Sequence, residues 1–350
     1  LGIDSMKTIL TLLVILSFER ALLAEEKGLY FPAAEGVWER IEPAEAGWDT
    51  AKLKQALDYA GRQKSSAVVI LAGGKLIAEK YWKPAAPEKR ANGSPNPYYY
   101  LRVGYNSQGH VVEDVASVQK SVTAMLVGIA QAKGLLKLSD PVQQHLGSGW
   151  SDAPAAAEAK ITIRHLISMT SGLTTQLKYE APAGSRWKYN TTAYAHARNC
   201  VVKAAKMSEN KLTDQWLTGP LGMKDSRWVP RPLAGKTGSI TNQYGFATTA
   251  RDLARFGLLM LANGEWDGET VLEDKEFIKA ATKPSQNLNK SYGYLWWLSP
   301  GKGMYSAKGR LVRRLYVIPG QNLVIVRLGD QPNMEFDGEF LRLLRAAMTK

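Results

Sequence analysis

The stretch VASVQKSVTAML, residues 115–126, opens the clearest helical pattern in the chain. From Ser117 to Lys133 the apolar residues recur every three or four positions, and Gly134 ends the pattern. The apolar residues that share this face are Val118, Val122, Met125, Leu126, Ile129 and Ala130. The pattern predicts an amphipathic helix that buries this face and begins at Ser117.

Strand patterns lie on either side of this helix. Residues 67–71 and 76–82 are two apolar segments around a Gly73-Gly74 turn, which is typical of a β-hairpin, and a helix is predicted before them over residues 50–63. Toward the C-terminus we expect helices over 250–262 and 335–348 and strands over 292–298, 304–318 and 322–328. The intervening residues, 135–240, alternate short helical stretches with turns.

This order predicts an α+β fold with two lobes. The two β-rich ends are expected to build one antiparallel sheet flanked by helices. The sheet-forming segments are 45–134 and 246–350, and an all-helical lobe at about 135–245 is inserted between them. Together they are expected to form one domain over residues 45–350.

Residues 1–24 have the pattern of a secretory signal peptide, with a few residues upstream of Met6. Lys7 is followed by an apolar run over residues 9–16, and Ala24 stands at the expected cleavage site. The run is far shorter than the ~20 residues that span a bilayer. We therefore expect a periplasmic or secreted protein without stable membrane insertion.

Composition narrows the function classes. The chain has 350 residues, of which 45% are hydrophobic and 22% charged, as in ordinary globular proteins. Its single cysteine, Cys200, excludes a Cys-based metal cluster, and its four histidines form no zincin pattern, so neither a metal nor a cofactor is expected. The net charge of +13 comes from dispersed Lys and Arg without a nucleic-acid-binding motif. No nucleic-acid partner is therefore expected.

The predicted helix carries one nucleophile motif, S-x-x-K at Ser117 and Lys120, whereas a G-x-S-x-G elbow is absent from the sequence. A serine at a helix N-terminus lies at the positive end of the helix dipole, and a lysine three residues later lies on the same face. A partly desolvated lysine in that position has a lowered pKa and can take the serine proton. The alternative is a capping serine followed by a surface lysine.

Four segments, in this order, resemble the serine β-lactamase and penicillin-binding-protein superfamily. They are VASVQKSVTAML at 115–126, ITIRHLISMTSGL at 161–173, PAGSRWKYNTTAY at 182–194 and FATTARDLARFGLLMLANGEW at 246–266. The branch that they resemble most is the class C β-lactamase-related group, which includes family VIII carboxylesterases and 6-aminohexanoate-dimer hydrolases. The resemblance implies a two-lobed hydrolase that forms an acyl-enzyme on Ser117 and needs no cofactor.

The resemblance also implies a catalytic tyrosine. The family's second motif, Tyr-x-Asn, matches Tyr189-Asn190-Thr191. Tyr189 is expected to shuttle protons between Ser117 and the leaving group, with its pKa lowered by Lys120. Thr191 replaces the family's asparagine, which helps to hold the lysine and the substrate amide, while Asn190 stands one position early. The alternative is that Tyr189 is a packed aromatic residue.

Two segments compete for the family's third motif, Lys-Thr-Gly or His-x-Gly on a strand near the carboxyl end. Lys236-Thr237-Gly238 has the right residues but lies in the helical middle of the chain, and we expect a turn there. Ala307-Lys308-Gly309 lies in a predicted strand that is followed by a hairpin partner and the last helix. Position favours residues 307–309, because the chemistry needs an edge strand beside the serine.

This choice assigns an oxyanion hole and a substrate class. By resemblance, the backbone N–H of Arg310 joins that of Ser117 in holding the oxyanion. Strand alternation turns Lys308 to the opposite face, so the cation that binds a β-lactam or peptide carboxylate is missing. The other residues expected around the substrate are Ala307, Gly309 and Thr191.

These losses favour a carboxylesterase that acts on short or medium acyl esters. The expected partner is therefore a small-molecule acyl substrate. A β-lactamase or an amide or peptide hydrolase on the same site is the alternative. A third hypothesis, motivated by the altered second and third motifs, is a catalytically silent penicillin-binding-like protein.

Overall fold

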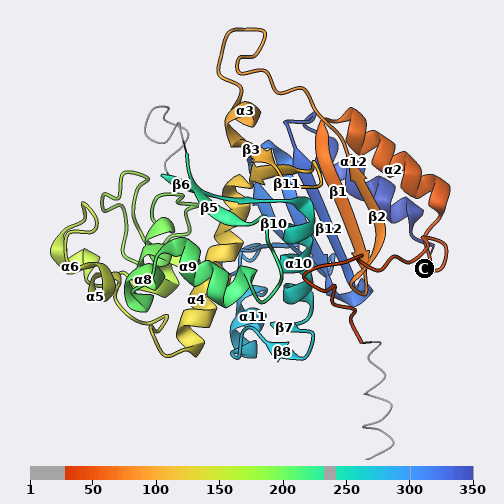
Figure 1. Cartoon of the computed structure of the whole chain (residues 1–350). Coiled ribbons are helices and arrows are strands. Elements are labelled where there is room, and N and C mark those ends of the chain that lie inside the picture. The colour runs from red at the N-terminus through yellow and green to blue at the C-terminus, as the bar shows by residue number, and fades with distance from the viewer. Residues whose placement is uncertain (1–27, 232–241, 300, 350) are drawn as a thin grey trace, which may run out of the picture. The chain divides into compact units, whose positions relative to one another are not determined.

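The computed structural model describes residues 28–231, 242–299 and 301–349, and within them six strands form the largest sheet (Figure 1). These strands are β1 (Ser65–Ala72), β2 (Lys75–Tyr81), β9 (Trp297–Ser299), β10 (Met304–Gly309), β11 (Arg313–Ile318) and β12 (Leu323–Gly329). Their order is β2-β1-β12-β11-β10-β9, with every pair antiparallel. The hairpin near the N-terminus therefore pairs with the last strand of the chain, which confirms the antiparallel sheet of the predicted α+β fold.

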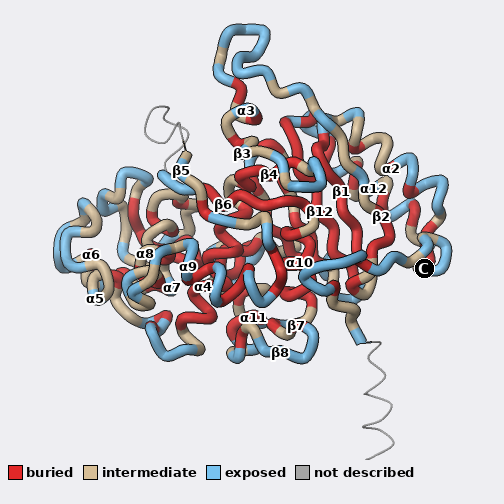
Figure 2. Tube along the Cα trace, in the orientation of Figure 1, coloured by how far each residue is buried: buried red, intermediate tan, exposed pale blue. Residues whose placement is uncertain are grey.

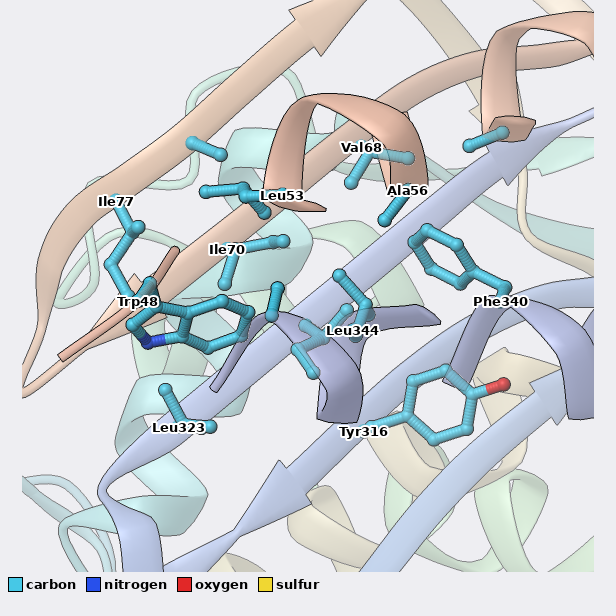
Figure 3. Packing of buried hydrophobic residues seen from close by; sticks show 14 of the residues in the cluster. Trp48, Leu53, Ala56, Val68, Ile70, Ile77, Tyr316, Leu323, Phe340 and Leu344 are labelled. Atoms are coloured by element: carbon cyan, nitrogen blue, oxygen red, sulfur yellow. The ribbon is translucent and has the colours of Figure 1, made fainter. Parts of the chain in front are cut away.

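Helices cover both faces of this sheet. On one face lie α2 (Thr50–Arg62) and α12 (Phe336–Ala347), which run side by side (Figure 1). Their apolar stripes pack on alternate residues of the strands, and the core includes Leu53, Ala56, Val68, Ile70, Tyr316, Leu323, Phe340 and Leu344 (Figure 3). On the other face α10 (Ala250–Leu261) packs against β1, β11 and β12. The sequence predicted all three helices within two residues at each end.

A second sheet of four strands lies next to the nucleophile segment and was not predicted. Its strands are β3 (Arg102–Tyr105), β4 (Val111–Asp114), β5 (Arg227–Pro230) and β6 (Tyr244–Thr248), in the order β3-β4-β6-β5. Each strand has four or five residues, and β4 pairs with β6 across more than a hundred residues of sequence. Strands this short leave little alternation to detect, and their pairing depends on the tertiary structure.

The remaining described elements are mostly short helices. The 3-10 turn η1 (Ala116–Val118) leads into α4 (Gln119–Ala132). Between α4 and β5 the chain forms five short helices and a π-helical turn. They are α5 (Val142–Leu146), α6 (Ala155–Glu158), α7 (Ile163–Ile167), α8 (Ala195–Ala205), α9 (Glu209–Thr213) and the turn η2 (Asp214–Thr218). Elsewhere lie α3 (Pro97–Leu101), β7 (Glu265–Trp266), β8 (Glu269–Thr270), α11 (Lys275–Ala281), η3 (Arg310–Val312) and η4 (Pro319–Gln321). The described part of the inserted region is mainly helical, but β5 and the start of β6 lie within 135–245, so the prediction that this region is all-helical is wrong. Its limits of 135–245 stay a prediction.

Two strand predictions need correction. The strand expected over 304–318 is β10 and β11, separated by the tight turn η3, in which Leu311 has a φ of 62°. The strand expected over 292–298 begins only at Trp297. β9 pairs with residues 304–306 alone, so β10 is not an edge strand along its whole length, although its last residues extend past β9. A continuous apolar pattern cannot show where a chain reverses when the turn lacks Gly, Pro or Asn.

Burial separates the interior from the loops. Figure 2 shows buried backbone along β1, β12, α4 and α10, and exposed backbone around α5 and α6 and in the loop before α3. None of the helices in the described ranges combines the length and the apolar character needed to cross a lipid bilayer. The predicted signal peptide, residues 1–24, and the predicted turn at 236–238 lie outside the described residues.

Candidate active site

The predicted nucleophile, Ser117, lies in a tight turn between a strand and a helix. The turn η1 follows β4 after one residue and runs into α4, which begins at Gln119, two residues later than predicted. Ala116 has a φ of 51°, and its N–H donates to Asp114 Oδ1 at 2.8 Å. Ser117 is therefore held at the N-terminal end of a buried helix, where the helix dipole favours developing negative charge.

Lys120 contacts the serine, as S-x-x-K spacing predicts. Its Nζ donates to Ser117 Oγ at 3.0 Å, and the side chain is only 2% exposed. Two tyrosine rings flank the amine, with centroids 4.8 Å away for Tyr189 and 4.2 Å away for Tyr194. The alternative of a surface lysine after a capping serine is therefore wrong.

The environment of Lys120 favours its neutral form. Burial lowers the pKa of the Lys120 amine well below its usual value, and the positive charge of Arg231 lowers this pKa further. A neutral amine within hydrogen-bond distance of a hydroxyl can accept its proton. The geometry is therefore that of a serine paired with a general base.

Tyr189 lies in the same cluster, but its pKa shifts in the opposite direction to the one expected. Its ring stacks on Trp297 at a centroid distance of 5.7 Å and meets Tyr292 edge-on at 6.2 Å. Burial raises the pKa of Tyr189 to about 12, and a hydrogen bond with Ser117 offsets only part of this rise. The expectation that Lys120 lowers the pKa of Tyr189 is wrong, because both groups are desolvated and the lysine is driven toward its neutral form.

The two residues after Tyr189 have different environments. The Asn190 amide donates to the carbonyl oxygens of Leu173 and Thr174 at 2.9 Å each, and its side-chain oxygen accepts from two backbone N–H groups. Asn190 is therefore a buried loop anchor that does not face the serine. Thr191 lines the pocket with Ser117, at the position where the family has asparagine.

The end of β10 reaches the serine, as position in the sequence predicted. Gly309 lies against the residue that precedes η1, and a Cβ there would collide with the Val115 carbonyl oxygen. Only glycine permits this close approach of two backbones. The next residue, Arg310, lines the same pocket as Ser117.

Ala307 and Lys308 differ in exposure. Ala307 is almost fully buried, and Lys308 is partly exposed, with Nζ 5.6 Å from the ring centroid of Trp297. Since Trp297 stacks on Tyr189, Lys308 lies one aromatic ring away from the predicted catalytic tyrosine. The position where the family's motif has lysine is an alanine here, and the amine of the neighbouring Lys308 lies over the Trp297 ring.

A small pocket of about 120 Å³ opens over Ser117. Its lining contains the polar or charged residues Gln119, Lys120, Thr191, Arg231, Asn242 and Arg310, together with Pro97 and Leu101 from the region of α3. Ser117, Lys120, Thr191 and Arg310 were predicted here from the sequence, whereas Gln119, Arg231 and Asn242 were not. Arg231 stands in no motif, and only the tertiary structure brings it to the serine.

A buried hydrogen-bond network includes Tyr194, whose ring flanks Lys120. Arg231 donates to both carboxylate oxygens of Asp114, at 2.6 and 2.9 Å, and to Gln119 Oε1 at 3.0 Å. Gln119 Nε2 donates to the Tyr194 hydroxyl at 2.6 Å, and so does Asn242 Nδ2 at 2.8 Å. The network fixes the charge of Arg231 near Lys120. Sequence analysis missed it, although Gln119 stands inside the S-x-x-K motif.

Within the described residues, no group of three or more His, Cys, Asp or Glu side chains is arranged to hold a metal ion. Cys200 is buried, and burial raises the pKa of its thiol to about 12. His165 is part of a capping box with Thr162 at the start of α7.

Comparison with known proteins identifies the family. Residues 50–348 match the Beta-lactamase family, so the chain belongs to it. This membership confirms the resemblance to the serine β-lactamase and penicillin-binding-protein superfamily that the four sequence segments carry.

Individual relatives are distant. The chain is 24% identical over 203 residues to the D-alanyl-D-alanine-carboxypeptidase/endopeptidase AmpH of Escherichia coli K12. The aligned region covers 50% of this chain and 48% of AmpH. The chain thus spans about half the length of this relative. Among solved structures, a Bacillus anthracis protein provisionally named a 6-aminohexanoate-dimer hydrolase matches with a TM-score of 0.67 at 18% identity, over 91% of this chain and 89% of that chain. A penicillin-binding protein from Bacillus halodurans matches with a TM-score of 0.60 at 16% identity, over 84% of this chain and 99% of that chain. These likenesses support the fold.

Proposed function

We propose that this protein is a serine hydrolase that forms an acyl-enzyme on Ser117 and acts on carboxylic esters of short or medium acyl chains. The observation that carries the proposal is the contact between Ser117 Oγ and the buried amine of Lys120, at 3.0 Å. A lysine that is buried and lies close to a second cation is an effective base near neutral pH.

The first half of the reaction begins with Ser117. Its Oγ attacks the acyl carbon while its proton passes to Lys120 Nζ, and the carbonyl oxygen becomes an oxyanion. The backbone N–H groups of Ser117 and Arg310 donate to this oxyanion. Collapse of the tetrahedral intermediate breaks the bond to the leaving alcohol, which takes a proton from the Tyr189 hydroxyl, and Tyr189 recovers a proton from Lys120.

The second half repeats these steps with water. Lys120 takes a proton from the water through Tyr189, the water oxygen attacks the acyl carbon, and Ser117 leaves with its proton restored. The raised pKa of Tyr189 suits a hydroxyl that donates a proton and is reprotonated at once, because a phenol that stays protonated at rest can supply the leaving group.

Two replacements support an ester substrate. Alanine at position 307 and threonine at position 191 stand where the family has a lysine and an asparagine that bind the carboxylate and the amide of its substrates. A site without these groups loses directed contacts to amides and lactams and keeps the machinery for acyl transfer. Esters need less assistance because their leaving group departs without protonation at nitrogen.

One observation favours a second candidate, an amide or peptide hydrolase. Two arginine residues, Arg231 and Arg310, line the pocket over Ser117. The positive charges of Arg90 and Arg313 act on Arg310 as well. A carboxylate on the substrate would find positive potential there, in keeping with the peptide substrates in the name of the AmpH relative.

A substrate panel decides between these candidates. We expect kcat/KM for p-nitrophenyl acyl esters to exceed that for a chromogenic cephalosporin and for a peptide ending in D-Ala-D-Ala by at least about 100-fold. The reverse order would establish the second candidate. Mass spectrometry after treatment with a fluorophosphonate probe tests both, because a protein without an adduct on Ser117 would be the silent penicillin-binding-like protein.

We also propose that residues 1–24 direct the protein to the periplasm or out of the cell. The basic start, the short apolar run and the terminal alanine support this assignment. Cell fractionation followed by N-terminal sequencing should find the mature protein outside the cytoplasm, beginning at Glu25. A full-length chain in the cytoplasm would contradict it.

A further inference from the structure

Two backbone turns contribute residues to the lining of the pocket, and both contain L-residues in the left-handed region. Ala116, before Ser117, has a φ of 51°. Leu311 and Val312, after Arg310, have φ values of 62° and 57°. This region is costly for residues with a Cβ, and for a β-branched valine it is an outlier. Such conformations persist only where the surrounding structure holds them.

A buried carboxylate holds the first turn. Asp114 Oδ1 accepts the Ala116 N–H at 2.8 Å, and the carboxylate is fixed in turn by Arg231. The position is specific, because a Cβ at Gly245 of β6 would occupy the space of the Asp114 carboxylate. The backbone of the nucleophile turn is therefore tied to β4 through one side chain.

Two fully buried arginines hold the second turn. Arg313 Nη1 donates to the Arg310 carbonyl oxygen at 3.2 Å, and Arg327 Nη1 donates to those of Leu311 and Val312 at 2.7 and 3.4 Å. Three successive carbonyl groups of the strained turn thus accept from guanidinium groups. These bonds compensate the turn for its unfavourable backbone conformation.

Arg313 is fixed by a second buried carboxylate on β4. Its Nε donates to Glu113 Oε2 at 3.0 Å, and its Nη2 lies 2.8 Å from the same oxygen. The other carboxylate oxygen accepts from the Tyr98 hydroxyl at 3.2 Å and from the Ser66 hydroxyl. Glu113 is completely buried, so this carboxylate has no solvent to compete for its hydrogen bonds.

We propose that Glu113 and Asp114 are positioning residues that together set the spacing of the two oxyanion donors. Asp114 acts on Ser117 through the Ala116 N–H, and Glu113 acts on Arg310 through Arg313. Consecutive residues of a strand point to opposite sides, so one short strand reaches both turns. The inference rests on the proposed acyl-transfer function, since the two N–H groups matter only if an oxyanion forms between them.

The test compares Glu113→Gln and Asp114→Asn with a matched control, Glu79→Gln. Glu79 is another buried carboxylate, paired with Arg251, but it contacts neither turn. We expect each β4 variant to lower kcat for ester hydrolysis by at least about 30-fold with KM within about threefold, because the lost geometry serves the transition state. Affinity for a boronic acid that forms a tetrahedral adduct on Ser117 should fall by a similar factor. Glu79→Gln should leave kcat and boronate affinity within about twofold.

A rescue separates positioning from general destabilisation. Glycine adopts a φ of +57° without steric cost, so Val312→Gly removes strain from the Arg310 turn alone. Added to Glu113→Gln, it should restore kcat at least about fivefold, and added to Asp114→Asn it should restore nothing. Should Glu113→Gln fail to fold, Tyr98→Phe removes one hydroxyl donor to Glu113 and should lower kcat and boronate affinity in parallel by about three- to tenfold.

The outcomes are distinct from those that test the proposed function. Activity that survives Ser117→Ala would overturn the acyl-enzyme itself. An inactive Ser117→Ala enzyme together with unchanged kcat in both β4 variants would keep the function and overturn the positioning role. Equal losses in Glu113→Gln and Glu79→Gln, a rise in KM alone, or an equal rescue of both β4 variants by Val312→Gly would also overturn it.

Discussion

The two backbone segments beside the pocket obtain their positions in different ways. The Ser117 side, residues 114–120, is one continuous stretch in which a strand end caps a turn and the turn starts a helix. The Arg310 side is held by side chains from three different strands, Arg313 of β11, Arg327 of β12 and the distant Glu113 of β4. Side-chain chemistry within one helical turn leaves a sequence motif, whereas a backbone N–H donor leaves the side chain free to vary. For this reason S-x-x-K can be recognised in the sequence, whereas the third motif cannot be recognised from its residues alone.

The largest expected effect is on the Ser117 side. Ser117→Ala removes the nucleophile and should lower kcat/KM for esters by at least about 10⁴-fold. The fold should survive, because a serine-to-alanine change at a helix N-terminus costs ~1 kcal/mol. Ester hydrolysis and a thermal melt check both statements. If Ser117→Ala stayed active, the nucleophile would be another residue, and the Ser117 and Arg310 sides could no longer be compared as parts of one active site.

The second effect concerns the proton path on the same side. Tyr189→Phe should lower kcat by about 10²- to 10⁴-fold with little change in KM, because the hydroxyl serves the transition state. Tyr194→Phe is the matched control, since the Tyr194 ring also packs against Lys120 but its hydroxyl is bonded to Gln119 and Asn242. Tyr194→Phe should lower kcat by less than about tenfold.

Steady-state kinetics of the two tyrosine variants and of Lys120→Ala test whether they act as one unit. Lys120→Ala should lower kcat at least as much as Tyr189→Phe. The variant that carries both substitutions should have a kcat scarcely below that of the less active single variant. If the losses in kcat from the two substitutions were additive, Tyr189 would only line the cleft and would not share a proton path with Lys120.

The third effect is on the Arg310 side. Gly309→Ala introduces a Cβ against the Val115 carbonyl oxygen and should push β10 away from the serine. We expect a loss of about 10- to 100-fold in kcat, as for a misplaced catalytic group. Gly320→Ala is the control, because open space surrounds that glycine and its φ is not positive. Equal activity of the two variants would show that the approach of β10 does not matter for catalysis.

The fourth effect is a shift with pH. The reaction needs neutral Lys120, so the rate should rise with pH as the lysine loses its proton. The Arg231 charge contributes to the lowered pKa of Lys120, and Arg231→Gln should therefore raise this pKa and move the acid limb of the kcat profile to higher pH. On that limb the rate should fall about threefold at fixed pH and recover in more alkaline buffer. An unmoved limb would mean that Arg231 does not tune the base.

The smallest effect is expected at the competing third motif. Lys236→Ala should keep kcat/KM within about threefold, because residues 307–309, and not 236–238, are proposed to stand beside the serine. A loss of about a hundredfold or more would assign the third motif to Lys236-Thr237-Gly238 and leave the Arg310 side without its proposed role.

Much of the fold was predictable because long elements bury periodic apolar faces. The helices at 50–63, 250–262 and 335–348 and the hairpin at 67–82 follow from periodicity and turn residues alone. The four-stranded sheet and the turn η3 did not, because β4 and β6 pair only when distant segments meet and Leu311 adopts its conformation under tertiary constraint. The same difference separates Ser117 and Lys120, whose contact was predicted, from Arg231 and Gln119, whose place in the pocket was not.

The sequence by itself determined that Ser117 and Lys120 lie close together, since side chains three residues apart at the start of a helix share one face. It also determined the apolar faces that build the six-stranded sheet. Only the tertiary structure decided the direction of the pKa shifts and the way the two turns beside the pocket are held. Burial and a distant arginine lower the pKa of Lys120, burial raises that of Tyr189, and two carboxylates of β4 hold the turns that carry the N–H groups. Solvent exclusion and through-space charge depend on neighbours that no local pattern specifies.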